Sequence, residues 1–145
     1  MEEHIGMPQM EKHIGMPQMG KNIGMPRMEE HIGIPSPDQA LQQLLDGNKR
    51  FVGATLSHPR QDGEHRISLG NGQTPFAAIL SCADSRVPPE VLFDQGLGDL
   101  FVVRVAGNIL NDQLLGSLEY AAGHLNTPVI MVLGHTKCGA IGAVA

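Results

Sequence analysis

Apolar residues along the second half of the chain occur in two alternating arrangements, continuous runs and helically spaced sets. Three runs, at 76–81, 100–105 and 127–133, have the length of strands and contain few polar residues. Between the last two runs, leucines and alanines recur at helical spacing over 112–125, which predicts a helix. Strands that are apolar throughout and alternate with helices are typical of a parallel sheet covered on both faces. The pattern therefore predicts an α/β fold, with a mostly parallel sheet flanked by helices.

Polar positions upstream of these runs predict where the folded part begins. Ser36 suits the N-cap of a helix, Pro37 suits its first position, and Gln39 completes a capping box. Three leucines then share one face of this helix, and Gly47 is expected to loosen it. We therefore expect an α/β domain over residues 36–145.

A nine-residue tandem repeat fills residues 1–35. Its units read His-Ile-Gly-Met-Pro-Gln-Met from positions 4 and 13, and two altered copies begin at positions 22 and 31. Glycine and proline recur in every unit and disfavour both a helix and a central strand, so a disordered tail is predicted. Seven of the eight methionines lie here beside three histidines, and such ligands suit soft metal ions. Duplication of a short coding segment is the simpler interpretation.

Composition and charge argue against several functional classes. The net charge is −5 and no basic stripe is interleaved with aromatic residues, which argues against nucleic-acid binding. No apolar run approaches the roughly 20 residues that span a bilayer, and the acidic amino terminus lacks the apolar segment of a secretory signal. Two cysteines without such a signal favour reduced thiols in the cytoplasm. A Cys82–Cys138 disulfide is the competing interpretation.

The two cysteines and one histidine lie where the predicted strands end. Cys82 directly follows the first strand, His135 follows the third, and Cys138 is three residues further on. Because the carboxyl ends of parallel strands meet at one edge of a sheet, these side chains are expected to converge. Sulfur and imidazole ligands suit zinc, and three protein ligands leave the fourth position that catalytic zinc sites keep open. The pattern predicts a catalytic zinc site; two structural cysteines and an unrelated histidine are the alternative.

Asp84 and Arg86 lie two and four residues beyond Cys82. A carboxylate beside an arginine stays ionised and accepts hydrogen bonds. Such an aspartate can accept a proton from zinc-bound water and orient the resulting hydroxide toward a substrate. A surface salt bridge at a turn is the other interpretation of this pair.

Several sequence blocks occur in the same order as in a known enzyme family. The blocks are Cys82-Ala-Asp-Ser-Arg-Val87, Phe101-Val-Val-Arg104, Ala106-Gly-Asn108, Gly116-Ser-Leu-Glu-Tyr120 and Gly134-His-Thr-Lys-Cys-Gly139. Together, over residues 36–145, they resemble the β-class carbonic anhydrases. The resemblance implies a zinc enzyme, normally dimeric or larger, that interconverts carbon dioxide and bicarbonate on an α/β fold.

The resemblance also implies a role for each matching residue. Cys82, His135 and Cys138 would bind Zn²⁺, and Asp84 with Arg86 would form the catalytic dyad. Zinc lowers the pKa of bound water, and the zinc-bound hydroxide that results attacks carbon dioxide.

Three further positions match the family. Gln73 corresponds to a substrate-binding glutamine, although its residue type alone fits an exposed loop amide equally well. Because the family builds its site at a subunit interface, we expect Gln73 to serve a neighbouring subunit. Gly139 could offer its backbone N–H to the substrate, or simply permit close packing. Arg104 matches an arginine of a second, inhibitory bicarbonate site found in some members. That site also needs a tryptophan where this chain has Ile79, so Arg104 is expected to serve structure.

The chain departs from the family at its carboxyl end. Family members continue well beyond the zinc motif, whereas this chain stops seven residues after Cys138. The domain is therefore expected to be truncated. Two alternatives to carbon dioxide hydration stay open: a truncated, non-catalytic zinc-binding homologue, and a hydrolase of carbon disulfide or carbonyl sulfide on the same fold.

Overall fold

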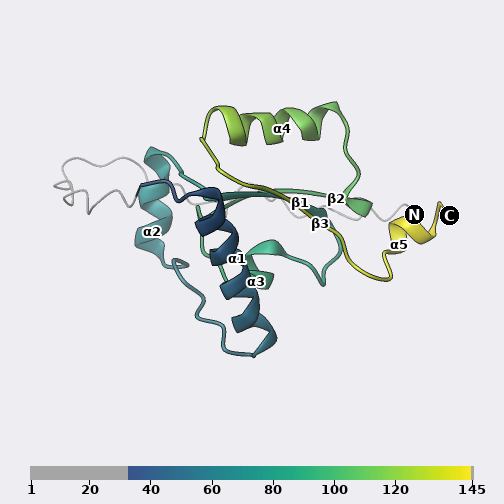
Figure 1. Ribbon diagram of the computed structural model, residues 1–145, viewed down its shortest axis with the longest axis horizontal. Helices are drawn as coiled ribbons and strands as arrows, with labels where there is room; N and C mark the ends of the chain where they lie inside the picture. The colour runs from purple at the N-terminus through teal and green to yellow at the C-terminus, as the bar shows by residue number, and fades with distance from the viewer. Residues whose placement is uncertain (1–32, 145) are drawn as a thin grey trace, which may run out of the picture. The chain divides into compact units, whose positions relative to one another are not determined.

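A computed structural model describes residues 33–144 of the chain. Three strands in this part pair in parallel in the order β2-β1-β3: β1 (Ala77–Cys82), β2 (Leu100–Val105) and β3 (Ile130–Leu133). The α-helices are α1 (Pro37–Val52), α2 (Gly63–Ser68), α3 (Pro89–Leu92), α4 (Asp112–Gly123) and α5 (Gly139–Gly142). In Figure 1, α4 lies on one side of the sheet, and α1 and α3 lie on the other. This architecture confirms the predicted α/β fold with its parallel sheet.

Two other expectations concern the tail and the membrane. The disordered tail predicted for residues 1–35 lies, apart from its last three positions, outside the described residues. Within residues 33–144, no helix has the length and apolar character that crossing a membrane requires.

The central strand, β1, is buried along its whole length between its two partners. Its side chains alternate between the two faces of the sheet. Ile79 packs in a cluster with Leu44 of α1, whereas Leu80 packs in a cluster with Leu118 of α4. Because both faces are covered by helices, every position in the strand faces a core, and this is why the apolar run in the sequence is continuous.

The first helix, α1, begins as the capping box predicts but continues further than expected. The N–H of Gln39 donates to Ser36 Oγ at 3.2 Å, and the N–H of Ser36 donates to Gln39 Oε1 at 2.8 Å. The helix then passes through Gly47 to Val52, so the expected loosening at Gly47 is wrong. A Cβ at Gly47 would lie 1.6 Å from the carbonyl oxygen of Phe93. The glycine is there because α1 and the segment after α3 touch backbone to backbone.

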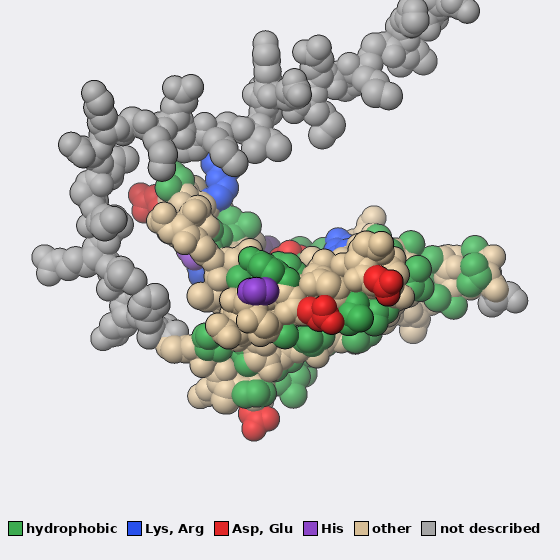
Figure 2. All heavy atoms as spheres, turned by 90° about the horizontal axis from the view of Figure 1, so that it is seen from above, with side chains coloured by type: hydrophobic (Ala, Val, Ile, Leu, Met, Phe, Trp, Pro, Cys, Tyr) green, Lys and Arg blue, Asp and Glu red, His purple; other side chains and the backbone are tan. Residues whose placement is uncertain are grey.

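The edge strand β3 is shorter and more exposed than the buried strand predicted over residues 127–133. It starts at Ile130 rather than at residue 127, and Ile130 and Val132 are 48% and 64% exposed. Both pair in register with residues of β1 that face α4. Figure 2 looks onto this side of the molecule and shows hydrophobic side chains at the surface among charged ones. Helical cover is therefore complete over β1 but not over β3.

Candidate metal centre

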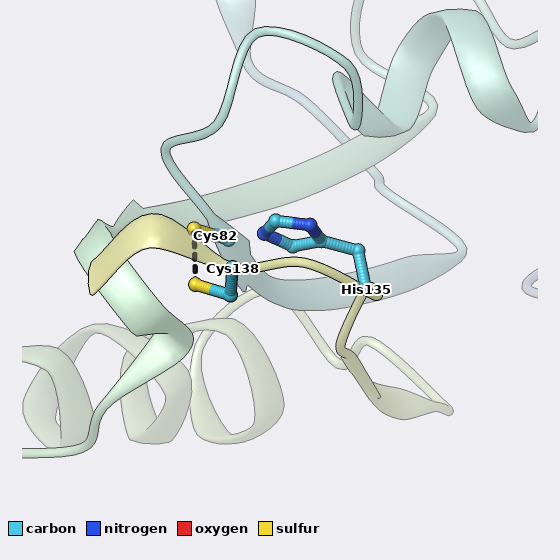
Figure 3. A group of neighbouring side chains, drawn as sticks. All are labelled: Cys82, His135 and Cys138. Carbon is cyan, nitrogen blue, oxygen red and sulfur yellow. Dashed lines mark hydrogen bonds between the residues drawn. The ribbon is translucent and has the colours of Figure 1, made fainter. Parts of the chain in front are cut away.

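Cys82, His135 and Cys138 meet at the edge of the sheet where the strands end. Cys82 is the last residue of β1, His135 lies two residues after β3, and Cys138 is the N-cap of α5. Their potential ligand atoms all lie within 4.8 Å of one another. Figure 3 shows the His135 ring directed toward the two sulfur atoms, which are 3.9 Å apart. The structure thus brings together three residues that are up to 56 positions apart in the chain.

The geometry of this cluster fits zinc. Two sulfurs at about 2.3 Å from a tetrahedral ion lie roughly 3.8 Å apart, which agrees with the 3.9 Å between Cys82 Sγ and Cys138 Sγ. His135 Nδ1 lies 3.0 Å from the Thr136 carbonyl. Arg86 Nη2, a donor, also approaches Nδ1 but is further away, at 3.4 Å. Since a carbonyl only accepts, the shorter contact assigns the proton to Nδ1 and leaves Nε2 with a free lone pair. Nε2 is buried and has no hydrogen-bond partner among the described residues, so a metal ion would satisfy it.

The Cys82 sulfur is stabilised as a thiolate by its surroundings. The backbone N–H of Gly107 donates to Sγ at 3.2 Å, and that of Asp84 donates at 3.4 Å. The neighbouring His135 imidazole, together with these two N–H groups, lowers the pKa of the Cys82 thiol to about 6. The Cys82 sulfur in turn raises the pKa of His135, although burial opposes this. Cys82 is therefore in its metal-binding form at neutral pH.

Gly107 has a role that the sequence did not reveal. It lies in the short 3-10 segment Ala106–Asn108 that follows β2, and it is buried with a φ of +71°. This left-handed conformation, which glycine adopts at little cost, accompanies an N–H directed at Cys82 Sγ. A glycine just after a strand was visible in the sequence, but nothing in its spacing indicated a contact with a ligand 25 residues away.

Asp84 and Arg86 form an ion pair beside the ligand cluster. Arg86 donates to both carboxylate oxygens at 2.8 Å and also to the Lys137 carbonyl at 3.2 Å. The guanidinium holds the pKa of the Asp84 carboxyl well below its usual range, and the carboxylate raises the pKa of Arg86. Asp84 Oδ2 lies 4.0 Å from His135 Nε2. An ionised carboxylate therefore stands next to the space where a metal ion and its fourth ligand would be.

Comparison with known proteins places this arrangement in a family. A family model described as carbonic anhydrase matches residues 77–145. Carbonic anhydrase 2 of Mycobacterium tuberculosis is 53% identical over 108 residues, covering 74% of this chain and 52% of that protein. Carbonic anhydrase of Mycolicibacterium smegmatis is 52% identical over 108 residues, with coverage of 74% and 52%. Among solved structures, the β-carbonic anhydrase CcaA matches at a TM-score of 0.53 and 34% identity, covering 72% of this chain and 52% of that one.

The chain belongs to the β-carbonic anhydrase family. Members of this family are zinc enzymes, and Cys82, His135 and Cys138 are the residues positioned here to bind a metal ion. The chain spans about half the length of the curated relatives that it matches.

The resemblance to β-carbonic anhydrases assigns Gly139 and Gln73 to substrate binding. Gly139 lies beside the metal-binding cluster, whereas Gln73 lies away from it. Gly139 is the first residue of α5, directly after Cys138. Apart from its chain neighbours and its own helix backbone, no heavy atom of residues 33–144 lies within 4 Å of where its Cβ would be. Close packing therefore does not explain this glycine. Gln73 is exposed and lies before the start of β1, whereas Cys82 ends that strand. Within one chain, the structure does not bring Gln73 to the cluster.

Proposed function

We propose that the protein is a carbonic anhydrase that uses Zn²⁺ to catalyse the reversible hydration of carbon dioxide to bicarbonate. The observation that carries the proposal is the ionised Asp84 carboxylate 4.0 Å from His135 Nε2, which has no hydrogen-bond partner within residues 33–144. A three-residue ligand set leaves one coordination position for a reacting group. The family membership supports the same reaction, since the relatives named above are carbonic anhydrases.

Each residue has a separate task in this proposal. Cys82, His135 and Cys138 would hold the zinc, which when bound would supply the Lewis acidity that makes water nucleophilic near neutral pH. Asp84 accepts a hydrogen bond from the reacting water and orients its lone pair toward carbon dioxide. Arg86 keeps Asp84 ionised and fixed in place, because it donates to both carboxylate oxygens.

Two further residues would bind the substrate. The backbone N–H of Gly139 belongs to the first turn of α5, where helical N–H groups lack intrahelical acceptors, so we assign it to a bicarbonate oxygen. Gln73 lies at the opposite end of β1 from Cys82. It can therefore reach a zinc site only in a second copy of the chain.

This requirement supports a homo-oligomer. Hydrophobic side chains exposed on the α4 side of the sheet include Ile130 and Val132, and exposed apolar surface of this kind is typical of interfaces. A solved chain from a study of two tetrameric β-carbonic anhydrases of Sordaria macrospora matches at a TM-score of 0.52 and 29% identity, covering 74% of this chain and 55% of that one. Zinc-binding thiols have to stay reduced, which favours the cytoplasm.

The alternative is a zinc-binding homologue without hydration activity. It is favoured by the incomplete cover of β3 among residues 33–144. Nothing in residues 33–144 favours the hydrolysis of carbon disulfide or carbonyl sulfide over hydration.

The test combines a zinc measurement with an assay of carbon dioxide hydration. We expect about one zinc per chain and an activity that falls by roughly 100-fold or more in Asp84→Ala, as for loss of a group that handles a proton. Asp46→Ala is the matched control, because Asp46 is a half-exposed aspartate on α1 that bonds only to side chains of its own helix. Bound zinc without activity would establish the non-catalytic alternative, and a chain that binds no zinc would exclude both.

A further inference from the structure

Arg104 reaches from β2 across to the turn that follows β1. Its Nε donates to the Cys82 carbonyl at 3.0 Å, and its Nη2 donates to the Asp84 carbonyl at 2.7 Å. These two carbonyls belong to one proposed zinc ligand and to the proposed catalytic carboxylate. One guanidinium thus contacts the backbone of both residues.

Arg104 contacts the Cys82–Asp84 segment at the point where the backbone hydrogen bonds between that segment and β2 end. The N–H of Ala83 donates to the Val105 carbonyl at 3.1 Å, which is the last backbone bond between this segment and β2 in the described residues. Beyond it, the Gly107 N–H is directed to the Cys82 sulfur. The carbonyls of Cys82 and Asp84, on either side of Ala83, both accept hydrogen bonds from the Arg104 side chain. The Asp84 carbonyl also accepts the backbone N–H of Val87 at 3.2 Å, but that bond lies within the turn and does not tie it to β2.

The chemistry of arginine suits this position. A guanidinium presents several N–H donors in a rigid planar fork, so two acceptors are held at a fixed separation. A lysine ammonium is a single donor centre on a flexible stem and cannot fix two carbonyls in the same way. Arg86 secures the same turn from its other side, through the Asp84 carboxylate and the Lys137 carbonyl. The turn is therefore tied to β2 through Arg104. It is tied through Arg86 to the loop that carries His135 and Cys138.

We propose that Arg104 is a positioning residue of the metal centre: it holds the Cys82–Asp84 turn so that the Cys82 sulfur and the Asp84 carboxylate face His135 and Cys138. The inference rests on the zinc site of the proposed function. It gives Arg104 a specific task within the same chain, because Nε and Nη2 are both engaged by backbone carbonyls of the turn.

The experiment measures metal binding rather than turnover. Zinc affinity is determined by competition with a chromophoric chelator, and the visible spectrum of the Co²⁺-substituted protein reports the ligand geometry. We expect Arg104→Ala to weaken zinc binding about tenfold or more, the range found for groups that orient metal ligands, and to change the cobalt spectrum. Arg104→Lys is expected to recover only part of the loss. Arg66→Ala, an exposed arginine on α2, is the control and should leave both readouts unchanged.

Several outcomes would overturn the inference. Zinc affinity and a cobalt spectrum in Arg104→Ala equal to those of Arg66→Ala would show that the turn does not need this side chain. Full recovery by Arg104→Lys would show that charge suffices and the two-carbonyl fork does not matter. A lower melting temperature of the metal-free protein with unchanged zinc affinity would reduce Arg104 to a purely structural role. If Arg104→Ala does not fold, Arg104→Lys carries the test, and unchanged zinc affinity in that variant is the overturning result.

These outcomes are separable from those of the proposed function. A chain that binds zinc but does not hydrate carbon dioxide contradicts the proposed function and leaves the Arg104 inference standing. Normal hydration with unchanged metal binding in Arg104→Ala does the reverse.

Discussion

Arg86 holds the Asp84 carboxylate at two points, with Nε on Oδ1 and Nη2 on Oδ2, each at 2.8 Å. The same guanidinium donates to the Lys137 carbonyl at 3.2 Å. The turn after β1 and the loop after β3 are therefore joined through one side chain. Since 55% of the Arg86 side chain is exposed, this ion pair contributes little to the free energy of unfolding. Its main effect is to orient the Asp84 carboxylate.

The first prediction concerns this two-point contact. Arg86→Lys keeps the positive charge and the backbone N–H that donates to Asp84 Oδ1 at 2.9 Å, but it loses the fork. Asp84 therefore stays ionised while its carboxylate is held less firmly. We expect the kcat of carbon dioxide hydration to fall about tenfold or more, with the melting temperature changed little. Stopped-flow assays with a pH indicator measure kcat, and Arg66→Lys on α2 is the matched control. Equal kcat values in the two variants would contradict a geometric role for Arg86.

The second prediction concerns removal of the metal. A ligand that binds only the folded state stabilises it, by about 2.7 kcal/mol when its free concentration is 100 times its dissociation constant. We therefore expect a chelator to lower the melting temperature of the protein and added zinc to restore it. In Cys138→Ser, which loses one sulfur of the cluster, this zinc-dependent shift should largely disappear. An unchanged shift in that variant would exclude Cys138 as a ligand.

A third prediction follows from a buried carboxylate remote from the metal centre. Asp94 is 2% exposed and accepts hydrogen bonds from Arg50 Nε, from the N–H and hydroxyl of Ser57, and from the His58 N–H. Burial alone would raise the pKa of Asp94, but these donors outweigh it and hold the pKa below its usual range. A carboxyl with a lowered folded-state pKa contributes stability above the unfolded-state value of about 3.9, and that contribution is lost as the pH falls further.

Urea unfolding at pH 7 and at pH 3 measures this contribution. We expect Asp94→Asn to lower the free energy of unfolding at pH 7 by about 2 kcal/mol, because a neutral amide is a weaker acceptor for these donors. The variant should also lose less stability than the wild type between the two pH values. Glu119→Gln, which changes an exposed carboxylate on α4, should keep the wild-type pH dependence. If both variants respond alike to pH, Asp94 is not the responsible group.

The fourth prediction separates two glycines that both lie inside helices. Gly47→Ala would place a Cβ 1.6 Å from the Phe93 carbonyl oxygen, so α1 has to move away from the core. We expect a loss of about 3 kcal/mol or more in the free energy of unfolding. In Gly116→Ala on α4, the new Cβ meets no heavy atom of the described residues within 4 Å outside its own helix. This change should instead stabilise the protein by about 0.5–1 kcal/mol. Thermal or urea unfolding decides, and a neutral Gly47→Ala would contradict the close contact.

These glycines also show where prediction from the sequence stops. The strands, the capping box at Ser36 and the convergence of the metal-binding residues could be predicted, because apolar runs and strand ends follow from local pattern and from the rules of parallel sheets. Gly47 was misinterpreted because a glycine that loosens a helix and one that admits a neighbouring backbone look the same in a sequence. The Gly107 N–H contact with Cys82 depends on strand order, which periodicity does not reveal.

Arg104 illustrates the same limit at the site itself. The sequence and the resemblance led only to the expectation that this arginine serves structure, since the position of its expected tryptophan partner is Ile79. Which atoms it would contact depends on the backbone of the turn after β1, where two carbonyls point to the same guanidinium. Side-chain donors to backbone acceptors of this kind leave no trace in hydrophobic periodicity.

The distance along the chain between the ligands makes the metal centre a marker of folding. Cys82 ends β1, whereas His135 and Cys138 follow β3, the last strand in the described residues. A chain in which β3 has not yet joined β1 has both sulfurs but not the geometry that binds a metal, since unfolded chains rarely contain a preformed site. In a refolding experiment with Co²⁺, the appearance of the cobalt colour would therefore report when β3 pairs with β1.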